Sequence, residues 1–157
     1  MNKGNYFIII LLIASIAIGV VGRTDQMKER ILSPDYDVAK KALEENIEKK
    51  DITAICLSLK HRAMSLRRKA ADALGSIQSK EAVECLTEAL KVNRNFMPFD
   101  TESTYIRDEL NRSLIKALRA ITGLNLPLKD KYSYVEDPEV EKIIAQIKEW
   151  QKANQNR

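Results

Sequence analysis

The sequence predicts an all-α fold, a short right-handed α-solenoid of stacked antiparallel helix pairs preceded by an N-terminal hydrophobic helix. Three observations lead to this prediction. Glycine and proline, which separate the elements of chains built from short strands, number only 5 and 4 in 157 residues. Apolar residues recur at spacings of three and four. A helix-pair pattern also repeats with a period of about 31 residues, because ITAICLSLK at 52–60 resembles AVECLTEALK at 82–91.

Residues 1–22 are predicted to be a signal peptide or a single-pass membrane anchor. Lys3 precedes an uncharged run from Gly4 to Gly22, which is close to the length of about 20 residues that a bilayer requires. Two interpretations remain open, cleavage at the small residues that end this run, or an uncleaved anchor crossing the membrane through residues 6–22. The anchor is slightly favoured, because the cleavage site is weaker than an A-x-A site.

The flanking charges leave the orientation of this segment open. Lys3 favours a cytoplasmic N-terminus, whereas Arg23, Lys28 and Arg30 argue the other way under the positive-inside rule. A short charged region before an apolar stretch is typical of an export signal. We therefore expect a cell-membrane protein whose domain is extracytoplasmic, or, after cleavage, a secreted or periplasmic protein.

The first two helices of the domain follow a polar, charged spacer at 23–33. Ser33-Pro34-Asp35 predicts a helix start, with proline in the first turn. Asp51 is the predicted cap of the second helix. The predicted inward residues are Tyr36, Ala39, Leu43 and Ile47 in the first helix, and Ile52, Ile55, Cys56 and Leu59 in the second.

The next two helices follow the short connection 61–64. The third is predicted over 65–77, and the fourth follows a cap at Ser79. Small alanine side chains at contact positions allow close helix packing. The predicted inward residues are Leu66, Ala70, Ala73, Leu74 and Ile77 in the third helix, and Ala82, Val83, Leu86, Ala89 and Leu90 in the fourth.

A long loop precedes each of the last two predicted helices. The loop 93–101 precedes a helix that begins at Ser103 or Thr104, and Gly123 is its predicted C-terminal cap. The loop 124–136 precedes a helix starting at Asp137, followed by a frayed tail at 154–157. The inward residues are Ile106, Leu110, Leu114, Ala117, Leu118 and Ile121, then Val140, Ile143, Ile144, Ile147 and Trp150.

The stretch 65–91 resembles the bacterial HEAT repeat of the phycobilisome-lyase type. The first helix of that repeat has the pattern VR..AA.ALG.I, matched here by Leu66-Arg67 and by KAADALGSI at 69–77. Its second helix has the pattern A...L...L, matched from Ala82 to Leu90. The segments 52–60 and 104–123 resemble halves of neighbouring copies, although Asn111 stands in the place of Arg67 and Arg119 in the place of Gly75.

This resemblance implies an armadillo-type fold over residues 34–153 and a function in protein binding. Such repeats usually present a curved surface to another protein. The expected function is a non-enzymatic interaction scaffold with a partner of unknown identity. The alternative is an accessory subunit or lyase-like protein that binds a small molecule.

The composition argues against metal, cofactor and nucleic-acid sites. One histidine and two cysteines without metal-ligand spacing are too few for zinc. The net charge of +4 comes from interspersed charges, so no nucleic acid is expected. Cys56 and Cys85 are interpreted as free thiols in the core, with a disulfide as the less favoured alternative in an oxidising compartment.

The candidate partner or anion surface combines a basic cluster with aromatic residues of the long loops. A purely structural role of the basic cluster is favoured over ligand binding: a solvated turn with one arginine that pairs with a neighbouring repeat. No catalytic residue is assigned, because His61 has no nucleophile and carboxylate around it. The candidate residues are Lys60, Arg62, Arg67, Arg68, Phe96, Phe99, Tyr132 and Tyr134.

Overall fold

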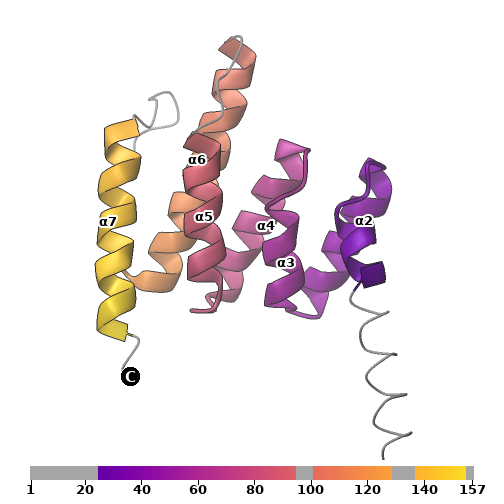
Figure 1. Ribbon diagram of the computed structural model, residues 1–157, viewed down its shortest axis with the longest axis horizontal. Helices are drawn as coiled ribbons and strands as arrows, with labels where there is room; N and C mark the ends of the chain where they lie inside the picture. Colours follow the sequence, from indigo (N-terminus) through magenta and orange to yellow (C-terminus); the bar gives the residue numbers. More distant parts are fainter. Residues whose placement is uncertain (1–24, 95–100, 129–136, 155–157) are drawn as a thin grey trace, which may run out of the picture.

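The computed structural model describes residues 25–94, 101–128 and 137–154, and every regular element in these ranges is an α-helix (Figure 1). The all-α prediction is therefore confirmed. A helical segment at 25–31 precedes the labelled helices. These are α2 (Tyr36–Glu48), α3 (Ile52–Ser58), α4 (Met64–Ile77), α5 (Ala82–Arg94), α6 (Thr101–Thr122) and α7 (Asp137–Asn154).

Contacts between the helices divide them into two series. In one series α4 packs between α2 and α6, and in the other α5 packs between α3 and α7 (Figure 1). The two series meet where α3 contacts α2 and α4, and where α5 contacts α6. A helix such as α4 thus touches a chain neighbour and also the helices two positions away. This packing buries the apolar stripe that the sequence pattern predicted for it.

The helix ends show the local chemistry that sets them. The Asp35 carboxylate accepts hydrogen bonds from the backbone N–H groups of Asp37 and Val38, and Asp51 accepts one from Ala54. Both side chains satisfy amides that have no partner within the helix. Because Asp35 is the cap, Pro34 lies before the helix and not in its first turn as predicted.

Gly123 ends α6 as predicted. Its φ of 71° lies in the left-handed region, where glycine has no Cβ to cause strain. Its N–H donates to the carbonyl of Arg119 at 2.9 Å, which satisfies one of the last carbonyls of the helix.

One contiguous core connects α2 to α7, and most predicted inward residues belong to it. Tyr36 is an exception, because its side chain is 44% exposed at the start of α2. Leu126 is the opposite case, since it lies in a predicted loop and is buried. Trp150 is partly buried against the core, as predicted. The other residues of the main cluster include Leu43, Ile55, Leu66, Leu74, Leu86, Leu90, Leu114, Leu118, Ile143 and Ile147.

Three helices are longer than the sequence predicted. α5 continues to Arg94 because the buried Asn93 side chain donates to the carbonyl of Arg107 at 3.0 Å and to Oδ1 of Asn111 at 2.8 Å. These bonds hold the end of α5 against α6. α6 begins at Thr101, before the predicted start. α7 runs to Asn154, whose side chain donates to the carbonyl of Trp150 at 2.8 Å.

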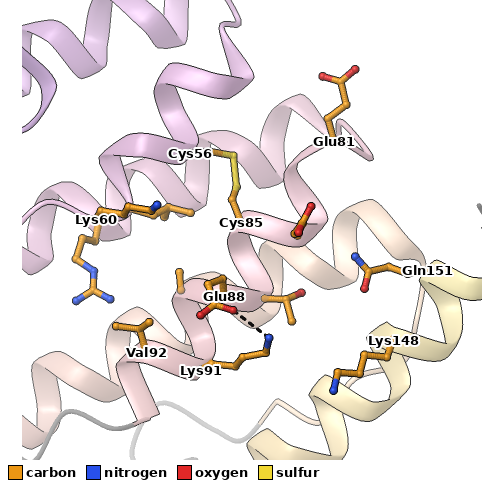
Figure 2. A pocket seen from close by; sticks show the side chains of 14 residues that line it. Cys56, Lys60, Glu81, Cys85, Glu88, Lys91, Val92, Lys148 and Gln151 are labelled. Carbon is orange, nitrogen blue, oxygen red and sulfur yellow. Dashed lines mark hydrogen bonds and ion pairs between the residues drawn. A yellow bond between two sulfur atoms is a disulfide. The ribbon is translucent and has the colours of Figure 1, made fainter. Parts of the chain in front are cut away.

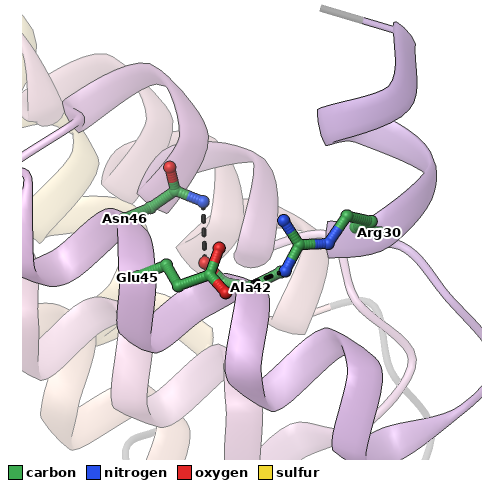
Figure 3. A network of polar contacts seen from close by, with 4 residues as sticks. All are labelled: Arg30, Ala42, Glu45 and Asn46. Carbon is green, nitrogen blue, oxygen red and sulfur yellow. Dashed lines mark hydrogen bonds and ion pairs between the residues drawn. The ribbon is translucent and has the colours of Figure 1, made fainter. Parts of the chain in front are cut away.

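The predicted spacer is partly structured, because residues 25–31 form a helix that packs against the domain. Ile31 is buried in a second apolar cluster with Ala42 and Ala54. Arg30 forms a 3.0 Å ion pair with Glu45 of α2 (Figure 3). That hydrogen bond lowers the pKa of Glu45 from its ordinary value. Beside this pair, the buried Asn46 amide donates to the carbonyl of Ala42 at 2.7 Å.

At Gly75, α4 lies close to the backbone of α6. A Cβ atom at this position would lie 2.8 Å from Cα of Ala117 and 3.0 Å from its Cβ. Since Cα is a backbone atom, it cannot move aside without shifting the helix. The glycine therefore sets how near these two helices can come.

The predicted membrane segment, residues 1–22, lies outside the described residues. Within 25–94, 101–128 and 137–154, none of the helices has the length and apolar character needed to cross a bilayer.

Candidate functional site

The residues of the predicted basic cluster have different environments, and two of them fasten the start of α2. His61 is only 4% exposed. Its Nδ1 accepts from the N–H of Ala63 at 2.9 Å, so its Nε2 carries the proton and donates to the carbonyl of Ser33 at 3.0 Å. Arg62 donates to the carbonyl of Pro34. Both side chains thus hold the turn that leads into α2.

Two further cations link neighbouring helices of the same series. Arg68 of α4 pairs with Glu109 of α6, and Lys69 of α4 pairs with Glu44 of α2. The hydrogen bond from Lys69 lowers the pKa of Glu44 from its ordinary value. Because these pairs are partly exposed, each adds little to stability. For Arg68 and Lys69, these ion pairs agree with the purely structural role of the basic cluster.

Arg67 lacks such a partner. Its side chain is half-buried, and its Nε is buried without a hydrogen-bond partner among the described residues. Among the described residues, the guanidinium donates to the thioether sulfur of Met64, at 3.4 Å. Burial lowers the pKa of Arg67 from its ordinary value. A cation desolvated without a counter-charge is unfavourable, and it is a feature of binding surfaces.

Arg67 and Lys60 both line an open groove of about 990 Å³ in which α3, α5 and α7 take part (Figure 2). These helices form the second of the two packing series. Side chains of both charges line the groove, among them Glu81, Glu84 and Lys148. The groove is thus an open surface depression bordered by many charged side chains, whereas pockets that bind small molecules usually carry only a few polar groups.

A disulfide forms part of the lining of this groove. Cys56 of α3 and Cys85 of α5 are bonded, with their Cα atoms 5.8 Å apart (Figure 2). The interpretation of these residues as free core thiols is therefore wrong. Both side chains are only partly buried. The sequence could not show this, because the bond depends on how α3 and α5 face each other.

The candidate site residues come together only in part. Lys60 and Arg67 lie in the groove, whereas Arg62 and Arg68 are engaged in the contacts described above. The four aromatic candidates lie outside the described residues; these are Phe96, Phe99, Tyr132 and Tyr134.

The sequence interpretation missed the α5 face of the groove. Glu84, Glu88 and Lys91 line it, and Glu88 pairs with Lys91 at 3.0 Å. These positions recur at spacings of three and four, opposite the apolar stripe of the same helix. That pattern also describes any solvated helix face, so only the packing of α3 and α7 beside α5 identifies it as a groove wall.

The His61 contacts lead to a stability prediction. Replacing His61 by alanine is expected to lower the free energy of unfolding by about 1–3 kcal/mol, because two partly buried hydrogen bonds of a buried side chain are lost. Arg62→Ala is the matched control, since its exposed side chain reaches the same turn and should cost less than about 1 kcal/mol. Urea titration of the full chain in detergent, followed by circular dichroism, measures both. Equal effects of the two substitutions would contradict the structural role of His61.

Comparisons with protein-family models, with curated proteins and with solved structures found no match to this chain.

Proposed function

We propose that this chain is a short right-handed α-solenoid that acts as a non-enzymatic scaffold for binding another protein. The single observation behind this proposal is the open, charged groove in which alternate helices α3, α5 and α7 take part. Helix-pair repeats bury their apolar faces by stacking on neighbours, and they commonly bind partners on the surface that successive helices share.

The likeness to HEAT repeats supports the same proposal. In the pattern ALG.I the glycine is Gly75, where α4 meets the backbone of α6. Close packing of successive helices requires a residue without a Cβ at this position, which is a physical reason for the glycine of that motif. Asn111, which departs from the repeat pattern, is buried and bonded to Asn93, as suits a modified terminal unit.

We further propose that the domain lies outside the cytoplasm, either anchored at the cell membrane through residues 6–22 or released after cleavage. The Cys56–Cys85 disulfide supports this location, because disulfides persist in oxidising compartments. The hydrophobic N-terminal segment supports it independently.

The proposed location predicts the thiol state in cells. Quenching cells with a membrane-permeant alkylating reagent, then separating the protein by mass, should reveal no free thiol unless the sample is first reduced. A Cys56→Ser variant supplies the control, because it leaves one free thiol that must be labelled. Complete labelling of the unreduced native chain would contradict an extracytoplasmic location.

The alternative is an accessory or lyase-like protein that binds a small molecule, and the size of the groove is the observation in its favour. Its volume of about 990 Å³ would hold such a ligand. The many charged side chains around it favour the scaffold.

Site-specific photo-crosslinking tests the scaffold against this alternative. Val92, which is 55% exposed, lines the groove, while Val38, 40% exposed, lies on α2 and does not line it. A photoreactive residue at position 92 should crosslink a protein in native membranes or in the secreted fraction, and one at position 38 should not. Crosslinks that are equal at both positions, or crosslinks from position 92 to small molecules only, would count against the scaffold.

A further inference from the structure

We infer that the groove binds an acidic segment of a partner protein and that Arg67 anchors a carboxylate of that segment. This inference rests on the proposed scaffold function and specifies the chemistry of its partner.

Three consecutive cations of α4 differ in whether they have a counter-charge among the described residues. Arg68 pairs with Glu109 and Lys69 pairs with Glu44, so each has a carboxylate from an adjacent helix. Arg67 is more buried than either, yet it forms no ion pair with any described residue. The residue that most needs a counter-charge is thus the one that lines the groove.

A carboxylate would compensate for this environment better than water does. The Nε of Arg67 is already buried without a partner, and a buried donor left unpaired is costly. Guanidinium groups bind carboxylates through two parallel N–H···O bonds, and such charge-assisted bonds are stronger than neutral ones. A ligand carboxylate therefore gains a strong contact while little further desolvation of Arg67 is needed.

The other charges of the groove favour an acidic ligand at one of its ends. Lys60 and Lys148 line the groove without an ion pair to a described residue, and so do Glu81 and Glu84, whereas Glu88 pairs with Lys91. Figure 2 shows Lys91 and Lys148 toward one end of the groove and Glu81 toward the other. An acidic residue of the partner should therefore lie away from Glu81.

The dimensions of the groove fit a short peptide. The 13 residues of α5 extend about 20 Å, which an extended segment of about six residues would span. Val92, which is 55% exposed, supplies apolar surface within the same groove, and the buried side chains of Leu59 and Ala89 line it. The expected ligand is thus a segment of six to eight residues, by the same geometry, with at least one glutamate or aspartate beside apolar side chains.

The test begins with a displayed library of random octapeptides, selected against the full chain in detergent. Enriched peptides are synthesised with a dye, and their dissociation constants are measured by fluorescence anisotropy. We expect the enriched peptides to contain glutamate or aspartate. Arg67→Gln should weaken their binding about tenfold or more, since a desolvated charge pair is lost. Arg68→Gln, the adjacent matched control, should change binding less than about twofold.

A second binding measurement changes the peptide and leaves the protein unaltered, so it does not depend on whether a protein variant folds. Replacing the acidic residue of the peptide by glutamine or asparagine should weaken binding to the unaltered protein by a similar factor. Circular dichroism shows whether each protein variant keeps its helical content.

Several results would overturn the inference. Enriched peptides without acidic residues, whose binding ignores Arg67→Gln, would leave the scaffold function standing and remove only the role of Arg67. Displacement of the peptide by succinate at similar concentration would assign the groove to small carboxylates. Tighter binding to phosphatidylglycerol vesicles, lost in Arg67→Gln, would assign it to lipid. No enriched peptide, together with no protein crosslink from position 92, would remove the scaffold function as well.

Discussion

Removing the Cys56–Cys85 disulfide is expected to lower the free energy of unfolding by about 3–4 kcal/mol. The bond joins residues separated by 29 positions. In the chain-entropy view, a crosslink that closes a loop of this length lowers the conformational entropy of the unfolded chain. This raises the free energy of the unfolded chain by about the same amount. This is a large share of the stability of an ordinary single domain.

The loss should be greatest around α3. This helix has only seven residues, which is too short to be stable alone. The disulfide fixes it to α5 on the groove side. We therefore expect amide hydrogen exchange in α3 to accelerate more than exchange in α4.

Urea titration of the full chain in detergent, with and without dithiothreitol, measures the effect. The Cys56→Ala, Cys85→Ala double variant is the matched control, because it should unfold at a low urea concentration that the reductant does not change. If the reduced native chain and the double variant were both as stable as the oxidised chain, the stabilising role of the bond would be wrong.

Replacing Gly75 by valine is expected to lower the free energy of unfolding by about 3 kcal/mol, and replacing it by alanine by about 1–2 kcal/mol. Alanine is favoured over glycine in a helix by up to about 1 kcal/mol. The contact of a new Cβ at 2.8 Å from Cα of Ala117 should outweigh that gain, because α4 and α6 must move apart.

Two further variants isolate the contact. Ser76→Ala changes the exposed neighbour of Gly75 in the same helix and should alter stability by less than about 0.5 kcal/mol. Adding Ala117→Gly to Gly75→Ala should restore part of the loss, since it removes the Cβ but leaves the backbone of α6 in place. A Gly75→Ala variant more stable than the native chain in urea titration would show that the two helices separate at little cost.

The positions of the helices could largely be predicted, whereas their exact lengths could not. Spacings of three and four and the acidic caps Asp35 and Asp51 are local features, so they identify a helix wherever it packs. The extension of α5 to Arg94 depends on Asn93 bonding to α6, across a loop. No local pattern contains that information.

The helix at 25–31 was missed for a related reason. Its sequence is mostly charged, and Met27 and Ile31 supply its apolar contacts with the domain. A charged segment with two apolar residues predicts a solvated spacer. Ile31 is buried because it packs against Ala42 of α2 and Ala54 of α3.

The candidate site was predicted only in outline. The sequence shows a cluster of cations around residues 60–69, but their types and spacing are equally suited to a solvated turn. Their environments differ because α2 and α6 place Glu44 and Glu109 within reach of Lys69 and Arg68, whereas Arg67 forms no ion pair with a described residue. Partners of this kind lie far away in the chain.

The sequence by itself determined the all-helical class, the order of the helices and the caps Asp51 and Gly123, because these follow from propensity, periodicity and hydrogen bonds within a few residues. Tertiary structure alone decided that Cys56 and Cys85 are bonded, that Gly75 meets Ala117, and that Arg67 lines a groove without an ion pair to a described residue. Each of these depends on the distance between side chains on different helices, which is fixed only when the helices pack.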